Sequence, residues 1–226
     1  MKMGKGIPRT FYLTYRHHSA IVDKRIRDIN TLYPEFDIKF YDDAACIDFL
    51  ESNYSDDYAK TFLKINHGAH KADFFRYCVL YKNGGCYIDL DNIPQKNIWD
   101  LVNKYNFTSC LRVGTHPAYR NDLKYNKKHI HQGFIATEPN SPILKHLINH
   151  MVNNPRPHVA IQNNPEFSEL APLAYHLYVR YFYKYLLDVV GVKELFHSTE
   201  YVVNGEKIFL IDTEDTSIMK YGVIQL

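Results

Sequence analysis

Apolar residues along the first third of the chain follow strand-like and helix-like periods in turn. Residues 9–15 are mostly apolar and predict a strand. Ser19 is a suitable cap for the helix that follows, and Pro34 ends it. The positions that line up along this helix are Ile21, Arg25, Ile29 and Leu32. Residues 36–41 alternate as a second strand. The order strand, helix, strand predicts an α/β domain whose sheet is largely parallel.

The rest of the chain continues the alternation. Further helices are predicted after Asp42 or Asp43, after Ser55 or Asp56, and at 68–81, 141–152 and 168–190. Further strands are predicted at 86–91, 107–113 and 130–137, and in a closing hairpin of 201–203 and 207–211. No repeat or disordered linker interrupts this order. We therefore expect residues 1–226 to form a single domain.

Composition excludes several classes of protein. The chain has 226 residues, 46% hydrophobic and 23% charged, as in ordinary globular proteins. No apolar run approaches the roughly 18 residues of a membrane span, and the basic residues at 1–6 lead into no hydrophobic signal segment. Four scattered cysteines without metal-ligand spacing indicate reduced thiols and a cytoplasmic location. A net charge of +2 is too small to indicate a nucleic-acid partner.

The chemistry is concentrated in residues 70–92. Strand alternation predicts that Asp89 and Asp91 point to the same face, near the carboxyl end of a strand, where open α/β sheets bind ligands. In the preceding helix, Asp73 and Arg76 are three residues apart and share a side. Helix and strand together can present five side chains to one pocket: Asp73, Arg76, Tyr87, Asp89 and Asp91.

Two neighbouring carboxylates repel each other unless a cation lies between them, and a hard divalent cation is the usual solution. A nucleotide diphosphate supplies complementary oxygens, Arg76 is suited to phosphate, and Asp73 can accept hydrogen bonds from sugar hydroxyls. Each feature has a plainer alternative by itself. A bare Asp-X-Asp occurs by chance, and Asp73 with Arg76 also fits a routine helix-surface pair.

Three consecutive motifs between residues 70 and 92 carry a resemblance to a known protein family. They are Lys-Ala-Asp-Phe-Phe-Arg-Tyr at 71–77, Leu-Tyr-X-X-Gly-Gly at 80–85, and Tyr-X-Asp-X-Asp at 87–91. The segment resembles the sugar-binding signature of the DXD glycosyltransferases of family 32. These include the yeast initiating mannosyltransferases and are related to the glucosylating large clostridial toxins. Residues 7–11 are similar to the family's opening strand under the nucleotide base, and 131–135 to the toxins' strand facing the transferred sugar.

The resemblance implies a GT-A-type, Rossmann-like fold with a mixed, mainly parallel sheet. Residues 1–95 would then be the nucleotide-sugar-binding half and 96–226 the sugar and acceptor half. It further implies a UDP- or GDP-sugar donor, Mn²⁺ (or Mg²⁺), and transfer of a hexose to a glycan, lipid or protein acceptor with retention of configuration.

Residue roles follow from the resemblance. Asp73 and Arg76 would contact sugar and diphosphate, and Tyr87 would lie by the nucleoside. Asp89 would touch ribose or sugar, and Asp91 would ligate the metal directly. The remaining assignments are Asp89 as a second metal residue, Thr14 and Tyr15 as donor-binding residues, and His131 and Gln132 as sugar-positioning residues.

Other questions stay open in the sequence. Candidates for a further metal ligand are His197, Glu214 and Asp215. His131 stands where the toxins have Asn. The basic loop 120–129 and the aromatic side of a helix at 175–187 are candidates for a peripheral membrane or acceptor contact, although a solvated loop and a core-packed helix explain them as well.

Two other functions compete with a transferase. Phosphohydrolases of the haloacid dehalogenase type also have Asp-X-Asp at a strand end, but usually in their first strand. A non-catalytic module that binds nucleotide-sugars would use the same residues. Hydrolysis of the donor distinguishes it from an enzyme.

Overall fold

The structure is a computed structural model that describes residues 6–113, 128–153, 199–203, 206–212 and 219–221. Its described helices are α1 (Ala20–Leu32), α2 (Asp43–Asn53), α3 (Asp56–Lys64), α4 (Gly68–Asn83), α5 (Trp99–Val102) and α6 (Pro142–Asn153). Its described strands are β1 (Thr10–Thr14), β2 (Asp37–Tyr41), β3 (Gly85–Ile88), β4 (Asn92–Pro94), β5 (Phe107–Val113), β6 (Lys128–Thr137), β7 (Thr199–Val203), β8 (Glu206–Asp212) and β9 (Met219–Tyr221).

Seven of these strands form one mixed sheet in the order β2-β1-β3-β6-β5-β8-β7. The pairs β1–β2, β1–β3 and β5–β8 are parallel, and the pairs β3–β6, β5–β6 and β7–β8 are antiparallel. Only β6 and β7 therefore run against the other five strands of this sheet. The predicted α/β fold with a mixed, mainly parallel sheet is confirmed. The strands β4 and β9 form a separate antiparallel pair.

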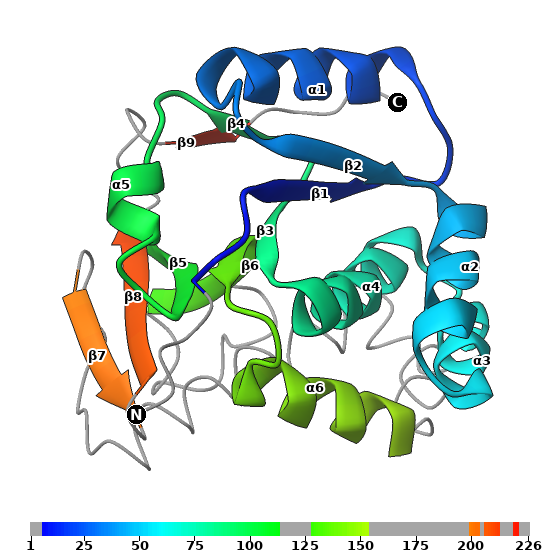
Figure 1. Ribbon diagram of the computed structural model, residues 1–226. Helices are drawn as coiled ribbons and strands as arrows, with labels where there is room; N and C mark the ends of the chain where they lie inside the picture. Colours follow the sequence, from blue (N-terminus) through cyan, green and yellow to red (C-terminus); the bar gives the residue numbers. More distant parts are fainter. Residues whose placement is uncertain (1–5, 114–127, 154–198, 204–205, 213–218, 222–226) are drawn as a thin grey trace.

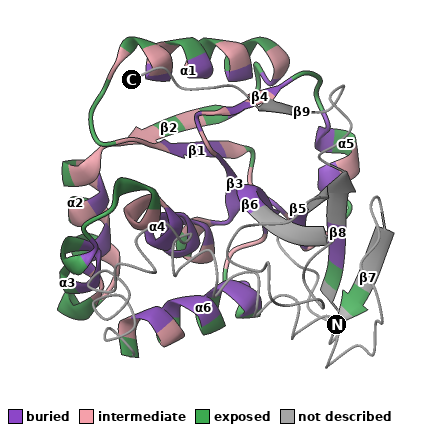
Figure 2. Ribbon diagram, turned by 180° about the vertical axis from the view of Figure 1, so that it is seen from behind, coloured by how far each residue is buried: buried purple, intermediate pink, exposed green. Residues whose placement is uncertain are grey.

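Helices cover both faces of the sheet. Figure 1 shows α1 over one face and α2, α3, α4 and α6 on the other. The two faces correspond to two buried clusters, which divide each strand by alternation. Phe11 and Ile88 belong to the α1 side, and Tyr12 and Tyr87 belong to the α4 side. The middle of α4, from Asp73 to Leu80, is buried, and α6 packs against this helix (Figure 2).

The two glycines between α4 and β3 allow a turn that other residues would obstruct. Gly84 has φ +67° and Gly85 has φ +98°. A Cβ on Gly84 would lie 2.7 Å from Pro139 Cδ, and one on Gly85 would lie 2.8 Å from the Thr10 carbonyl oxygen. The chain thus enters β3 close against β1, so the acidic residues that follow lie near the centre of the sheet.

Most predicted elements that fall within the described residues are present. The side chain of Asp42 caps α2 by accepting a hydrogen bond from the Ala45 N–H (2.8 Å), and β7 and β8 form the predicted hairpin. In α1, however, Val22 rather than Ile21 is buried beside Arg25 and Ile29. The predicted helix at 168–190 lies outside the described residues. Among the described helices, none has the length and apolar character needed to cross a membrane.

Candidate functional site

The two motif aspartates lie in a turn rather than in a strand. β3 ends at Ile88, so the predicted strand over 86–91 is too long at its carboxyl end. The Asn92 N–H donates to the Asp89 carbonyl (3.0 Å), which closes a tight turn, and the Asp89 N–H donates to the Gly133 carbonyl of β6 (2.8 Å). The predicted proximity still holds, since the charge of Asp89 acts on Asp91. It arises from the turn and not from strand alternation.

Arg76 is the centre of the site. Its Nη2 lies 2.8 Å from Asp89 Oδ1 and 3.1 Å from Asp73 Oδ1, and its Nη1 lies 3.4 Å from Asp89 Oδ2. Nη1 also donates to the Gln132 carbonyl (2.6 Å), and Nε to the Ala72 carbonyl (3.4 Å). The side chain is 3% exposed. All three nitrogens of this guanidinium donate hydrogen bonds to protein acceptors, and Nη2 also forms the ion pair with Asp73.

Beneath this guanidinium lies the ring of Tyr87, with its centroid 4.5 Å from Arg76 Cζ. This is a cation–π contact, and both side chains are buried. Tyr87 therefore supports Arg76 in this structure. The nucleoside contact that the resemblance implies for Tyr87 stays a prediction.

Asp73 is a buried carboxyl group with one oxygen unused. Its Oδ1 accepts from Gln132 Nε2 (2.7 Å), and the Tyr77 hydroxyl donates to Gln132 Oε1. Its Oδ2 is buried without a hydrogen-bond partner. Burial and the charge of Asp89 raise the pKa of Asp73 to about 7, although Arg76 and Gln132 act in the opposite direction. A buried acceptor without a hydrogen bond destabilises the folded protein, so this oxygen is suited to accept a hydrogen bond from a hydroxyl group of a ligand.

Asp91 differs from Asp73 and Asp89 in its contact with arginine. Its carboxylate lies near the positive charges of Arg76 and Arg25, but the structure shows no direct contact between it and either guanidinium. Burial and the charge of Asp89 raise the pKa of Asp91 to about 6, while its own backbone N–H, Arg76 and Arg25 lower it. Asp89, by contrast, directs both oxygens at Arg76.

The acidic turn fits a hard cation only in part. Carboxylate oxygens are the ligands that Mn²⁺ and Mg²⁺ prefer, and the close pair Asp89 and Asp91 offers them. In the part of the chain that the structure describes, no three His, Cys, Asp or Glu side chains form a metal-binding group. The remaining ligands would then come from diphosphate oxygens and water. The proposed further ligands His197, Glu214 and Asp215 lie outside the described residues, as does most of the basic loop 120–129.

Thr14 and Tyr15 lie at the same edge of the sheet as the turn. The parallel register pairs Tyr12 with Tyr87, and two residues further on this register brings Thr14 level with Asp89. The Thr14 hydroxyl lies 3.5 Å from Cys46 Sγ, and the Tyr15 N–H donates to the Tyr41 carbonyl (3.3 Å). Both residues are half-buried, and their contact with a donor stays a prediction.

Gln132 enters the site from β6, and His131 precedes it in the same strand. The Gln132 side chain is buried and bonded to Asp73, so any action of its amide on a sugar would pass through that carboxyl group. The side chain of His131 is not among those the structure describes, although its backbone belongs to β6. Its predicted contact with the sugar therefore stays a prediction.

Comparison with known proteins identifies this arrangement. Residues 19–108 match the family described as glycosyltransferase sugar-binding region containing DXD motif. This segment is similar to the sugar-binding region of the DXD glycosyltransferases. It contains Asp73, Arg76 and the acidic turn, and the resemblance found in the sequence is confirmed.

Two curated relatives and one solved structure agree with this family. The chain is 29% identical over 116 residues to an uncharacterized glycosyltransferase of Acanthamoeba polyphaga mimivirus, which covers 51% of this chain and 42% of the relative. It is 36% identical over 84 residues to the initiation-specific alpha-1,6-mannosyltransferase of Schizosaccharomyces pombe. This match covers 34% of this chain and 21% of the relative. The chain thus spans less than half the length of these relatives. The PaToxG glycosyltransferase structure matches with a TM-score of 0.54 at 15% identity, over 83% of this chain and 73% of that one, and shows the GT-A fold.

Sequence reasoning missed two residues of the DXD glycosyltransferase site. Tyr77 was given no role, although a buried tyrosine hydroxyl usually has a hydrogen-bond partner, and here the partner is Gln132. Arg25 was placed with the aligned residues of its helix, but its guanidinium contacts the Leu90 carbonyl. The available signal was a charged residue within an otherwise apolar helix face.

Proposed function

We propose that this protein is a metal-dependent glycosyltransferase that transfers a hexose from a UDP- or GDP-sugar to a hydroxyl group of a glycan, lipid or protein. The observation that supports this most strongly is the acidic turn at the carboxyl end of β3, with Arg76 between Asp89 and Asp73. The turn follows a GT-A sheet at the edge where such sheets bind ligands.

The charges of the site suit a nucleotide diphosphate with a cation. The carboxyl groups of Asp73 and Asp89 contact the guanidinium of Arg76, and Asp91 lies within reach of the charges of Asp89, Arg76 and Arg25. A bound divalent cation would offset the excess negative charge and neutralise charge on the departing diphosphate. Asp91 is the best placed residue to hold that cation, because its oxygens are not directed at Arg76. Asp89 is held rigidly and is suited to orient ribose or sugar hydroxyls.

Sugar recognition would fall to Asp73. Its unused Oδ2 can accept a hydrogen bond from a sugar hydroxyl, which replaces the partner that this buried oxygen lacks. Gln132 and Arg76 hold Oδ1 and so fix the direction in which Oδ2 points. A sugar without that hydroxyl would leave the oxygen unsatisfied, and such sites discriminate strongly against analogues.

Retention of configuration agrees with the residues of β6. An inverting enzyme needs a base, usually a carboxylate, beside the reacting carbon, and β6 contains none. Glu138 follows the strand, but Thr137 pairs with Gly85 at the opposite end of β3 from Asp89. In the retaining step, the acceptor oxygen bonds to the anomeric carbon as the carbon–phosphate oxygen bond breaks. The acceptor proton then passes to a β-phosphate oxygen. His131 is the alternative base.

The first experiment identifies the donor. Melting temperatures are measured with UDP- and GDP-sugars, each with and without Mn²⁺. One nucleotide class should stabilise the protein, and only when Mn²⁺ is present. Slow release of free sugar from that donor would separate an enzyme from a module that only binds nucleotide-sugars. If no nucleotide stabilises the protein in either condition, the proposed function is wrong.

The second experiment determines the stereochemistry. Proton NMR of the first product formed from an α-linked donor should show an α-linkage. A β-linkage would exclude the retaining step and make His131 the candidate base. The alternative of a haloacid dehalogenase-type phosphohydrolase has no support in this structure. Its nucleophile would be Asp89, whose two oxygens are both engaged by Arg76.

A further inference from the structure

Arg25 is a buried charge in a helix that contains none of the site residues. It lies on the inner face of α1 between Val22 and Ile29, and its side chain is 2% exposed. An arginine is rarely buried unless its N–H groups are satisfied, because removing the charge from water is unfavourable. The contacts of its guanidinium therefore show what it does in the fold.

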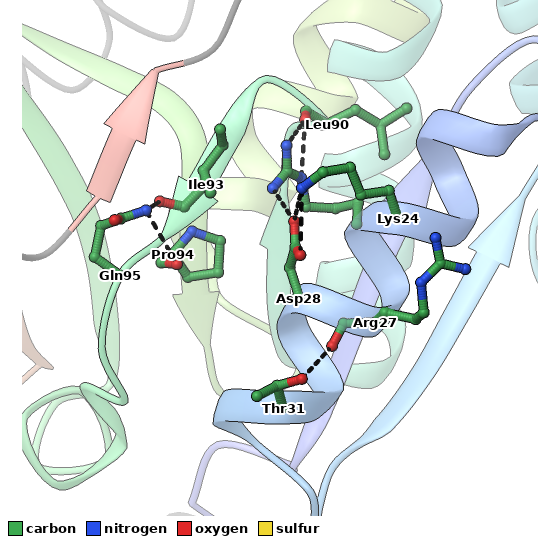
Figure 3. Close-up of polar contacts among 9 residues, drawn as sticks. Lys24, Arg27, Asp28, Thr31, Leu90, Ile93, Pro94 and Gln95 are labelled. Carbon is green, nitrogen blue, oxygen red and sulfur yellow. Dashed lines mark hydrogen bonds and ion pairs between the residues drawn. The ribbon is translucent and has the colours of Figure 1, made fainter.

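The guanidinium contacts the acidic turn directly. Nε and Nη2 both donate to the Leu90 carbonyl oxygen, at 2.9 and 2.6 Å, and Nη1 lies 2.9 Å from Asp28 Oδ2. Figure 3 labels Leu90 and Asp28, the two partners of this guanidinium, and marks polar contacts among the residues drawn with dashed lines. Leu90 is the residue between the two motif aspartates. Arg25, which precedes Leu90 by 65 residues, thus binds the central peptide group of the turn through two donors.

Leu90 is held at two points, its side chain and its carbonyl oxygen. Its side chain is buried in the cluster on the α1 side of the sheet, with Cys86 and Ile88. Its carbonyl oxygen is fixed by Arg25. The direction in which the chain leaves Leu90 is then set, and with it the direction in which Asp91 projects relative to Asp89.

Among the described residues, the other contacts of the turn are made to Asp89. The Asp89 N–H bonds to Gly133, its carbonyl accepts from Asn92, and its carboxylate binds Arg76. Arg25 is the side chain that binds the peptide group immediately before Asp91. A residue that orients a metal ligand without touching the metal usually matters for binding, because its mutation typically lowers metal affinity by roughly 10- to 100-fold.

We propose that Arg25 is a positioning residue of the acidic turn, which orders the Leu90–Asp91 peptide so that Asp91 meets the metal and diphosphate. This proposal rests on the proposed function. Arg25 does not touch the donor. It acts through the Leu90 carbonyl, and Asp28 holds it in place.

Lys24 offers a matched control. Its Nζ lies 3.0 Å from the same Asp28 oxygen that Arg25 contacts, but the side chain is 58% exposed and makes no contact with Leu90 that the structure shows. Lys24→Met removes one positive charge beside Asp28 and leaves the contact with Leu90 intact. Arg25→Lys keeps the charge but loses the two-donor contact with the carbonyl.

The test uses two measurements on the whole protein. The first is amide hydrogen exchange over residues 88–94, which reports the order of the turn without any ligand. The second is the affinity for Mn²⁺ in the presence of the nucleoside diphosphate that stabilises the wild type. In Arg25→Lys the turn should exchange faster, and Mn²⁺ should bind roughly 10- to 100-fold more weakly. Lys24→Met should match the wild type in both measurements.

Either measurement can overturn the proposal. Wild-type exchange in a folded Arg25→Lys protein would show that Arg25 does not order the turn. Faster exchange with unchanged Mn²⁺ affinity would show that this order is irrelevant to the site. If Arg25→Lys fails to fold, Arg25→Gln is judged by the same two criteria. If the wild type binds no Mn²⁺ with any nucleoside diphosphate, the proposed function fails, while the exchange result still decides whether Arg25 orders the turn.

Discussion

The raised pKa of Asp73 predicts that this residue makes the protein less stable as pH rises. The unfolded chain should lose the Asp73 proton near the ordinary pKa of 3.8, whereas the folded protein should hold it until about 7. Between these values the unfolded state binds fewer protons than the folded state. The stability from Asp73 is therefore fully present below pH 3.8 and is lost as pH rises through about 7.

The size of this effect follows from the pH interval. Where the folded state alone holds the proton, stability falls by about 1.4 kcal/mol per pH unit. From pH 5 to pH 8 this slope applies in full up to about pH 7 and then fades. We therefore expect Asp73 to remove roughly 2 to 3 kcal/mol of stability over that interval.

The assay compares the wild type with Asp73→Asn by urea denaturation at pH 5 and pH 8, with EDTA present. Asn cannot titrate, so the difference in free energy of unfolding between the two proteins should shift against the wild type by the amount above. Asp57→Asn, at an exposed carboxylate of α3, controls for the exchange of an aspartate for an asparagine.

A flat or opposite pH dependence would refute the reasoning. It would mean that Asp73 is already ionised in the folded protein at pH 5. The attraction of Arg76 at 3.1 Å would then outweigh burial. The Oδ2 atom would then be an acceptor for sugar hydroxyls at pH 5 as well as at higher pH.

Three further predictions follow from the site and the fold. Asp91→Asn should remove the stabilisation that Mn²⁺ gives with a nucleoside diphosphate while the protein stays folded, and an equal rise in melting temperature in both proteins would contradict the ligand role. Arg76→Ala removes the buried cation that pairs with Asp73 and Asp89 and should cost about 3 to 5 kcal/mol in urea denaturation. It should also weaken nucleotide-sugar binding more than nucleoside binding by calorimetry, and equal losses would make Arg76 purely structural. Gly85→Ala places a Cβ 2.8 Å from the Thr10 carbonyl at φ +98° and should cost about 1 to 3 kcal/mol, unlike Gly68→Ala, whose Cβ would meet nothing within 4 Å.

The sequence predicted the elements well because local patterns determine them. The strand 9–15 corresponds to β1, and the glycine pair after residue 83 does mark the turn into β3. These features depend on alternation, caps and backbone freedom, which neighbouring residues set. The spacing of Asp73 and Arg76 likewise predicted that they share a helix side, and they form an ion pair.

What the sequence could not predict depends on contacts between distant residues. Nothing local shows that Arg76 has Asp89 as its main partner, or that Arg25 contacts Leu90. The same holds for the end of β3, since alternation continues through Asp91 in the sequence. The strand ends earlier because the chain turns at Asp89, and two distant residues bind this turn: the Gly133 carbonyl accepts from the Asp89 N–H, and Arg25 donates to the Leu90 carbonyl.

The position of β3 in the sheet explains why the site forms at its end. β3 pairs in parallel with β1 and in antiparallel with β6. The carboxyl end of β1 and the middle of β6 therefore meet at the same point, on opposite sides of the acidic turn. Thr14 comes from the first side and Gln132 from the second. If the nucleotide lies over β1 and the sugar over β6, the diphosphate must cross the end of β3, where Asp91 projects. In that case the topology would bring the cation and the leaving group to the same place, as glycosyl transfer requires.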